Sequence, residues 1–272
     1  MFEAIPPSTV CTAVTWLSPS DIAVGCANGF VAAWNIASAA ESAPFVYQRI
    51  HRTYILDLNS AYPTYPHLLG STSMDGDVRL VSLLDPEKDV TETGHMRLPP
   101  PQIPYFPLLQ SFLSTDENDF VRMFTVRRFI TTNVVIKCEG PISAMAAGSP
   151  WHPSILLGCT DGTVVATNPI RKVAHHKEKQ LKLVWFVHEW APGRKAGEPR
   201  VSRFRDGFSA DNTNLLRNFS GDPRLVNGVM IKPIFDEGAH ITALSWNPNQ
   251  HCASWVGAGM GCGLVRVEDL AI

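Results

Sequence analysis

The segment from Ile22 to Trp34 reads IAVGCANGFVAAW, two apolar stretches joined by the dipeptide Asn28-Gly29. A two-residue hairpin turn requires positive φ at both central residues, and Asn followed by Gly adopts that backbone at the lowest cost. Apolar strands on both sides of such a dipeptide are typical of a β-hairpin. A further apolar strand, Val14–Leu17, and a Ser18-Pro19-Ser20 turn precede it. The stretch therefore predicts a small antiparallel sheet.

The same pattern occurs three more times along the chain. Each copy has an apolar strand, a turn, a second apolar strand that ends in small residues, a glycine turn and a third apolar strand. The copies begin at Ile55, Ile142 and Ile241, and their glycine turns are Asp75-Gly76, Asp161-Gly162 and Gly261-Cys262-Gly263. Internal repetition of this kind indicates a repeat architecture.

The spacing of the turn glycines is informative as well. Successive turn glycines lie 47, 86 and 101 residues apart, so the second interval holds two steps of 43 residues and the third two steps of about 50. Repeats of roughly 40–45 residues with four strands are typical of β-propeller blades. The two long intervals predict two weaker blades. One would use 108–114 and 120–124, and the other 181–190 and 226–235.

The prediction is thus an all-β, WD-repeat-like β-propeller of about six four-stranded blades, with seven as the alternative count. It would be a single domain over residues 1–272, with a polar, basic insertion at about 191–222. The Trp-Asp dipeptide that gives such repeats their name is absent, and the first repeat ends in Trp34-Asn35. The sequence leaves open whether the ring closes by itself, needs a partner or needs a further N-terminal blade.

Composition excludes several classes of protein. The chain has 272 residues, of which 45% are hydrophobic and 18% charged, whereas disordered chains are rich in charge and poor in apolar residues. The net charge of −2 excludes a polybasic nucleic-acid coat. Six cysteines without CxxC spacing predict reduced thiols, with Cys26 and Cys159 buried in strands. The uncharged run 240–265 is interrupted by polar residues and glycines, so no membrane partner is expected.

Positive charge is concentrated in one region. Residues 171–205 contain ten Lys or Arg and three Glu, a net charge of +7, so the rest of the chain carries −9. Such asymmetry can mark a surface that faces phosphates or an acidic partner, and a solvated loop is the alternative. Trp185, Phe186 and Trp190 could stack bases, but their strand-like alternation favours core packing. The candidate contact residues are Arg171, Lys172, Lys177, Lys179, Lys182, Arg203 and Arg205.

No motif predicts catalysis, and no metal or cofactor is expected. There is no GxSxG nucleophile elbow, and the glycine-rich stretch 257–263 lacks the Lys-Ser/Thr of a phosphate loop. His175-His176 has no cysteine or carboxylate at ligand spacing. Asp57 is predicted to be a buried hydrogen-bond acceptor between blades, and the proline-rich stretch 98–104 an extended connector.

Several segments together resemble a known family. They read HPSILLG at 152–158, ATNPIRK at 166–172, WFVHEW at 185–190, ITALSWNPN at 241–249 and GMGCGLVRVEDL at 259–270. They resemble the C-terminal propeller of the fungal WD-repeat subunit of TFIIIC, the assembly factor of RNA polymerase III. The resemblance extends from about Val10 to the last residue.

The resemblance implies a nuclear, non-enzymatic scaffold. Its partners would be the other TFIIIC subunits in the module that recognises the B-box promoters of tRNA genes, and DNA would be reached through that complex. A generic propeller adaptor, for example in trafficking or ubiquitin ligation, is the alternative function. A propeller enzyme would need converging carboxylates or metal ligands, which the sequence does not show.

Overall fold

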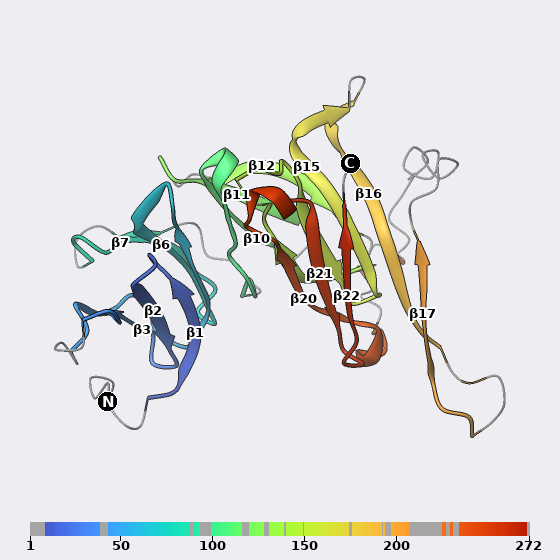
Figure 1. The fold of residues 1–272 in the computed structure, drawn as a ribbon, viewed down its shortest axis with the longest axis horizontal. Coiled ribbons are helices and arrows are strands. Elements are labelled where there is room, and N and C mark those ends of the chain that lie inside the picture. Colours follow the sequence, from blue (N-terminus) through green and yellow to red (C-terminus); the bar gives the residue numbers. More distant parts are fainter. Residues whose placement is uncertain are drawn as a thin grey trace. The chain divides into compact units, whose positions relative to one another are not determined.

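A computed structural model gives the fold (Figure 1). It describes residues 9–38, 43–86, 90–92, 99–115, 120–127, 131–138, 140–148, 150–173, 176–191, 193, 197–206, 225–226, 229–230 and 234–270. These ranges contain β-strands and short 3-10 turns but no α-helix, and so no helix that could cross a membrane. The chain divides into two compact units, Met1–Val134 and Val135–Ile272. The all-β prediction is confirmed.

The first unit is built from antiparallel sheets whose strands follow one another in chain order. The first sheet is β1 (Cys11–Trp16), β2 (Asp21–Cys26), β3 (Phe30–Asn35) and β4 (Val46–Arg49). The second is β5 (Ile55–Ala61), β6 (Tyr65–Ser73), β7 (Val78–Ser82) and β8 (Val90–Glu92). The third is β9 (Tyr105–Phe106), β10 (Ser111–Thr115), β11 (Phe120–Thr125) and β12 (Thr131–Lys137), which runs past the unit boundary. The 3-10 turn η1 (Pro107–Leu109) joins β9 to β10.

The second unit contains a five-stranded and a three-stranded sheet. The larger is β13 (Ile142–Ala146), β14 (Ile155–Cys159), β15 (Thr163–Val173), β16 (His176–Ala191) and β17 (Val201–Asp206). The smaller is β20 (Ile241–Trp246), β21 (Trp255–Met260) and β22 (Val265–Asp269). Turns η3 (Glu237–Ala239) and η4 (Gln250–Cys252) flank β20, and β18 (Leu225–Val226) pairs with β19 (Val229–Met230).

The strands of the four clear repeats are confirmed, and so are those of the first weaker one, as β10 and β11. The first half of the second weaker repeat is wrong, and its second half, 226–235, lies partly outside the described residues. Segment 181–190 lies in β16, which pairs with β15 and so belongs to the sheet that β13 begins. Pairing with the preceding strand needs only a short loop, which costs less conformational entropy than starting a new sheet. Among the described residues, five sheets have three or more strands.

The glycine turns are hairpins of a different type from the one predicted. Gly29, Gly76 and Gly162 have φ of +83°, +84° and +82°, but the Asn or Asp before each does not have positive φ. The N–H of Gly29 bonds back to Cys26 O, as in a type I turn that ends in a left-handed glycine. The Asn28 Oδ1 instead accepts the Phe30 N–H, and Asp161 Oδ1 accepts the Thr163 N–H in the same way. The side chains at these positions therefore hold the turn by hydrogen bonds.

Neighbouring sheets in the first unit meet at a glycine. A Cβ added to Gly25 in β2 would lie 2.7 Å from Ile55 Cγ2 and 3.1 Å from Leu58 Cδ1 in β5. The Thr12 hydroxyl beside it contacts Gly25 O at 3.1 Å and Ile55 O at 2.6 Å, so it bridges the two sheets. Around this contact lies an apolar core that includes Ala23, Ala33, Val46, Leu69 and Val81.

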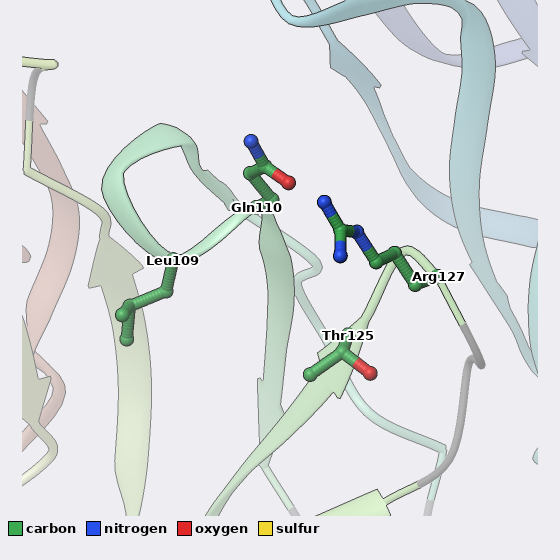
Figure 2. Close-up of a pocket in the computed structure, with 4 residues that line it drawn as sticks. All are labelled: Leu109, Gln110, Thr125 and Arg127. Atoms are coloured by element: carbon green, nitrogen blue, oxygen red, sulfur yellow. The ribbon is translucent and has the colours of Figure 1, made fainter.

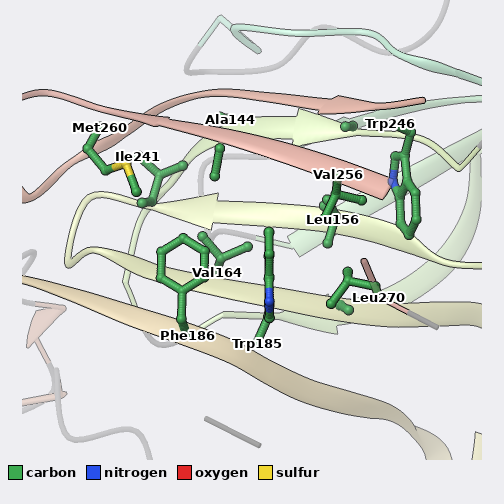
Figure 3. Close-up of a cluster of buried hydrophobic side chains, with 13 residues drawn as sticks. Ala144, Leu156, Val164, Trp185, Phe186, Ile241, Trp246, Val256, Met260 and Leu270 are labelled. Atoms are coloured by element: carbon green, nitrogen blue, oxygen red, sulfur yellow. The ribbon is translucent and has the colours of Figure 1, made fainter. Parts of the chain in front are cut away.

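The second unit repeats this arrangement with different residues. A Cβ on Gly158 would lie 2.4 Å from Ile241 Cγ2, and the Ser143 hydroxyl contacts Gly158 O at 3.3 Å and Ile241 O at 2.7 Å. Figure 3 shows the core that surrounds Ile241, with Leu156 and Val164 on one sheet and Val256 and Met260 on the other. The absence of a side chain at the glycine is what lets the isoleucine approach.

We expect Gly158→Ala to destabilise the protein by about 1–3 kcal/mol, because the new methyl group would overlap the Ile241 side chain. Gly259→Ala is the matched control. Gly259 pairs with Ala243 as Gly158 pairs with Ala144, but its Cβ would meet nothing closer than 3.6 Å. The control should change stability by less than about 0.5 kcal/mol. Urea denaturation measures both, and equal effects would contradict this account.

Candidate functional site

The basic residues predicted to bind a partner lie mainly on a β-ribbon. Strands β15 and β16 have 11 and 16 residues. Strand β14 pairs with β15 only as far as Thr167, and β17 pairs with β16 only from Phe186 onward. Segments 168–173 and 176–182 follow these pairings, with Thr167 opposite Lys182, Lys172 opposite Gln180 and Val173 opposite His176. We call these two segments the ribbon; they belong to the long strands β15 and β16 in Figure 1.

Five of the seven predicted contact residues belong to the ribbon. They are Arg171 and Lys172 on β15, and Lys177, Lys179 and Lys182 on β16. Their side chains lie outside what the structure describes, as does all of His175. The sequence gives the ribbon five basic residues and one acidic residue, Glu178. The pairing of β15 with β16 thus brings two basic segments of the chain together.

The other two predicted contact residues lie elsewhere on the sheet. Arg203 and Arg205 are exposed on β17, opposite Glu189 and Val187 of β16. From Lys182 to Glu189 the extended strand covers about 23 Å, at about 3.3 Å per residue. Arg205 also forms an ion pair with Glu189, which offsets part of its charge. The seven residues therefore form two groups, and β17 itself lies inside the expected insertion 191–222.

Arg266 on β22 contacts side chains of β17 and so links the two strands. The Arg266 guanidinium lies 4.7 Å from the ring centre of Phe186 and 4.9 Å from that of Phe204. It pairs with Asp206 at 2.8 Å and with Glu268, whose Oε2 accepts the Trp185 Nε1–H at 2.6 Å. Trp185 and Phe186 are buried, which confirms the packing prediction for these two rings, whereas Trp190 is only half-buried. Sequence patterns missed this cluster because its members are up to 83 residues apart.

A hydrogen-bonded network of Ser71, His51 and Asp75 in the first unit resembles the Ser-His-Asp triad of a hydrolase. His51 Nδ1 lies 3.2 Å from both Asp75 oxygens, and its Nε2 lies 2.8 Å from Ser71 Oγ. Burial lowers the pKa of His51, and this favours a neutral ring that donates to Asp75 and accepts from Ser71. Burial would raise the pKa of Asp75, but N–H bonds from Arg52 and Asp77, together with His51, lower it instead.

The location of the Ser71–His51–Asp75 network makes its role structural. Ser71 is fully buried and His51 is 2% exposed, so a substrate cannot reach the hydroxyl. The His51 backbone also contacts the first glycine turn, because its N–H donates to Gly29 O at 3.0 Å. The network therefore ties the end of the first sheet to β6 and to the turn before β7.

Asp57 lies between the second and third sheets, as predicted. Its Oδ2 accepts the Ile103 N–H at 2.8 Å and its Oδ1 accepts the Leu58 N–H at 2.9 Å. Burial raises its pKa to about 6, although both hydrogen bonds act in the opposite direction. Pro99–Pro104 forms no regular element and connects β8 to β9, as expected of a connector. Cys26 and Cys159 are buried, also as predicted.

A hollow of about 320 Å³ lies on the third sheet (Figure 2). Leu109, Gln110, Thr125 and Arg127 line it. Gln110 has a left-handed backbone with φ of +47°, and its Oε1 accepts the Tyr65 hydroxyl at 3.0 Å. The lining offers one cation and no carboxylate or histidine, so it provides no acid–base pair. In the part of the chain that the structure describes, no three metal-ligating side chains converge.

Comparison with known proteins found two similar fungal proteins, and no family model matches the chain. Transcription factor tau subunit sfc6 of Schizosaccharomyces pombe is 29% identical over 263 residues, 94% of this chain and 42% of that protein. The transcription factor tau 91 kDa subunit of Saccharomyces cerevisiae is 25% identical over 267 residues, 97% of this chain and 37% of that protein. Both are TFIIIC subunits.

The resemblance to a TFIIIC subunit is confirmed. The similarity extends over 94% and 97% of the chain, and therefore over residues of both units. The chain spans about two-fifths of the length of these relatives. Both relatives are subunits of a transcription factor.

Arg266→Gln should loosen β17. The variant removes the cation from Phe186 and Phe204 and leaves Glu268 and Asp206 without their partner, at a cost of about 1–3 kcal/mol. Amide hydrogen exchange should accelerate in Val201–Asp206. Arg203→Gln is the control, because Arg203 is exposed on the same strand, and it should leave exchange unchanged. Equal protection in both variants would show that Arg266 does not hold the strand.

Asp57 should make stability depend on pH. Its native pKa of about 6 lies above the unfolded value of about 3.9, so its contribution is fully present below pH 4. That contribution, about 3 kcal/mol, is lost as the pH rises through 6. Asp57→Asn keeps an acceptor for Ile103 but cannot ionise. Denaturant titrations from pH 4 to 7 should show a fall in wild-type stability that the variant lacks, and parallel curves would refute the assignment.

Proposed function

We propose that this chain is a non-enzymatic scaffold of a TFIIIC-type complex. In the nucleus it would help to assemble that complex on the B-box promoters of tRNA genes for transcription by RNA polymerase III. The observation that carries the proposal is the similarity to two transcription factor tau subunits over 94% and 97% of the chain. The partners would be other subunits of the complex, which would bring the chain to DNA.

The proposal includes a WD-repeat-like β-propeller of about six blades in a single domain, with a basic insertion at about 191–222. Consecutive antiparallel sheets support it, because each is built in chain order as a blade is. The repeated packing of an isoleucine on a glycine also supports it, since Ile55 and Ile241 begin their sheets in the same way. A blade-like unit cannot bury both of its faces alone, so it stacks on neighbours.

A protein partner has a suitable surface on the first sheet. Val14 and Trp16 on β1 are 68% and 58% exposed, and Tyr47 on β4 stacks on Phe30 with ring centres 4.9 Å apart. Large exposed apolar patches mark interaction sites more often than chance positions do. We propose that another subunit covers this face. The basic residues Arg171, Lys172, Lys177, Lys179, Lys182, Arg203 and Arg205 would face nucleic acid or an acidic partner.

Affinity purification of the tagged chain from its own cells, followed by mass spectrometry, tests the proposal. We expect the other TFIIIC subunits in near-equal amounts. Val14→Glu combined with Trp16→Glu should abolish their recovery, because two charges would be buried in the interface. Leu84→Glu changes an isolated side chain that is 80% exposed and should leave recovery intact. Recovery of an unrelated set of proteins would favour a generic adaptor and overturn the proposal.

A further inference from the structure

Two sheets have a glycine surface that holds the first residue of the next sheet. Gly25 in β2 receives Ile55 of β5, and Gly158 in β14 receives Ile241 of β20. Gly259 in β21 has the same position, since each of the three glycines pairs with an alanine of its first strand just after a bulge. A Cβ on Gly259 would meet no described atom closer than 3.6 Å. The last sheet therefore repeats this surface without an isoleucine on it.

The side chains around Gly259 are exposed, whereas their counterparts are buried. The valine opposite the glycine in the third strand is buried in the first sheet (Val31) and in the β13 sheet (Val164, Figure 3). In the last sheet it is Val265, which is 72% exposed, and Val267 two residues further on is 57% exposed. Directly opposite residues and residues two apart share one face of a sheet. We call Gly259, Val265 and Val267 the glycine face.

A hydroxyl beside the glycine supports the comparison. Thr12 and Ser143 each donate to the main-chain carbonyl of the isoleucine in the next sheet, at 2.6 Å and 2.7 Å. Thr242 has the equivalent position in β20, but it is exposed. Among the described residues, its hydroxyl meets only the Gly259 carbonyl of its own sheet, at 3.2 Å. The last sheet thus has the donor for a following sheet and an apolar face to receive it.

The first sheet offers the matching half of this contact. Cys11 begins β1 and pairs with β2 just before the bulge, as Ile55 begins β5 and pairs with β6. Val14 follows three residues later, where β5 has Leu58, which packs on the same glycine as Ile55. Cys11 is exposed and Val14 is 68% exposed. We call Cys11 and Val14 the Val14 face, and one chain therefore exposes both halves of its recurring contact between sheets.

We propose that the free chain binds a second copy of itself, with the Val14 face of one copy covering the glycine face of the next. The sequence leaves open whether the repeats need a partner, and a second copy supplies residues at the positions that cover this surface elsewhere in the fold. The two faces differ, so the contact is heterologous and continues into a ring or an open chain of copies.

The inference goes beyond the proposed function and does not rest on it. In the complex, another subunit is proposed to cover Val14 and Trp16. That subunit would compete with the second copy for the same side chains, so self-association belongs to the chain without its partners.

Sedimentation analysis of the whole chain with two blocked variants tests the proposal. Val265→Glu blocks the glycine face and Val14→Glu blocks the Val14 face, because each would bury an unpaired charge in the contact. Wild type should associate with rising concentration, and each variant alone should stay monomeric. An equimolar mixture should form a 1:1 dimer, since one variant keeps the Val14 face and the other keeps the glycine face.

Three further variants make the test specific. Gly259→Ala should weaken association at least about tenfold, because the added methyl group would overlap the incoming strand. Cys11→Ile restores the residue found at Ile55 and Ile241 and should tighten association about fivefold. Leu84→Glu adds the same charge at a side chain that is 80% exposed and outside both faces, so it should associate like wild type. Gly259→Ala and Cys11→Ile keep the test decisive if circular dichroism shows that a glutamate variant is unfolded.

Three results would overturn the inference. They are a wild type that stays monomeric up to about 100 μM, a mixture of the two folded blocked variants that stays monomeric, or an equal loss of association in Leu84→Glu. The outcome is separable from that of the proposed function, because Val265→Glu leaves the Val14 face intact. Recovery of TFIIIC subunits with a monomeric wild type rejects only self-association, and self-association without that recovery rejects only the TFIIIC assignment.

Discussion

The contact between a glycine in one sheet and an isoleucine in the next holds each unit together. A sheet of this kind exposes two apolar faces, and it becomes stable only when a neighbour covers one of them. Gly25 and Gly158 allow the backbones to come close enough for Ile55 and Ile241 to fill the space. The hydroxyls of Thr12 and Ser143 then bridge the same pairs of strands. Apolar burial and a hydrogen bond therefore fix the same spacing.

The polar groups described next stabilise the packing of the sheets and have no catalytic role. Asp75, His51 and Ser71 have the order of a hydrolase triad, yet they satisfy one another's hydrogen bonds, with His51 and Ser71 buried. A buried polar group is costly when it has no partner, so such a chain fixes the register of the elements that carry it. Asp57 bonds the backbone of Ile103 across two sheets for the same reason.

The surfaces proposed to bind partners lie where the repeated pattern is interrupted. Strands β15 and β16 extend past their pairings with β14 and β17, and segments 168–173 and 176–182 carry five basic residues. Strand β17 adds a fifth strand, held by Arg266 between two phenylalanine rings. On the first sheet, Val14 and Trp16 are exposed, whereas the corresponding Leu244 and Trp246 of β20 pack into the core of the second unit. Departures from the repeat thus separate an apolar surface from a basic one.

The sequence by itself determined the all-β class, the strands of the clear repeats and the resemblance to a TFIIIC subunit. These depend on local alternation, on turn glycines and on motif identity, which need no knowledge of distant contacts. The sequence alone places 181–190 wrongly in a new sheet, because an apolar run of this length fits either a new sheet or an added strand of the preceding one. The turn type could not be predicted from the sequence either, since Asn28 or Asp161 can adopt positive φ or supply a side-chain hydrogen-bond acceptor. Only the tertiary structure separated Arg203 and Arg205 from the ribbon and joined Arg266 to Phe186, because strand pairing and sheet packing unite residues that the chain keeps far apart.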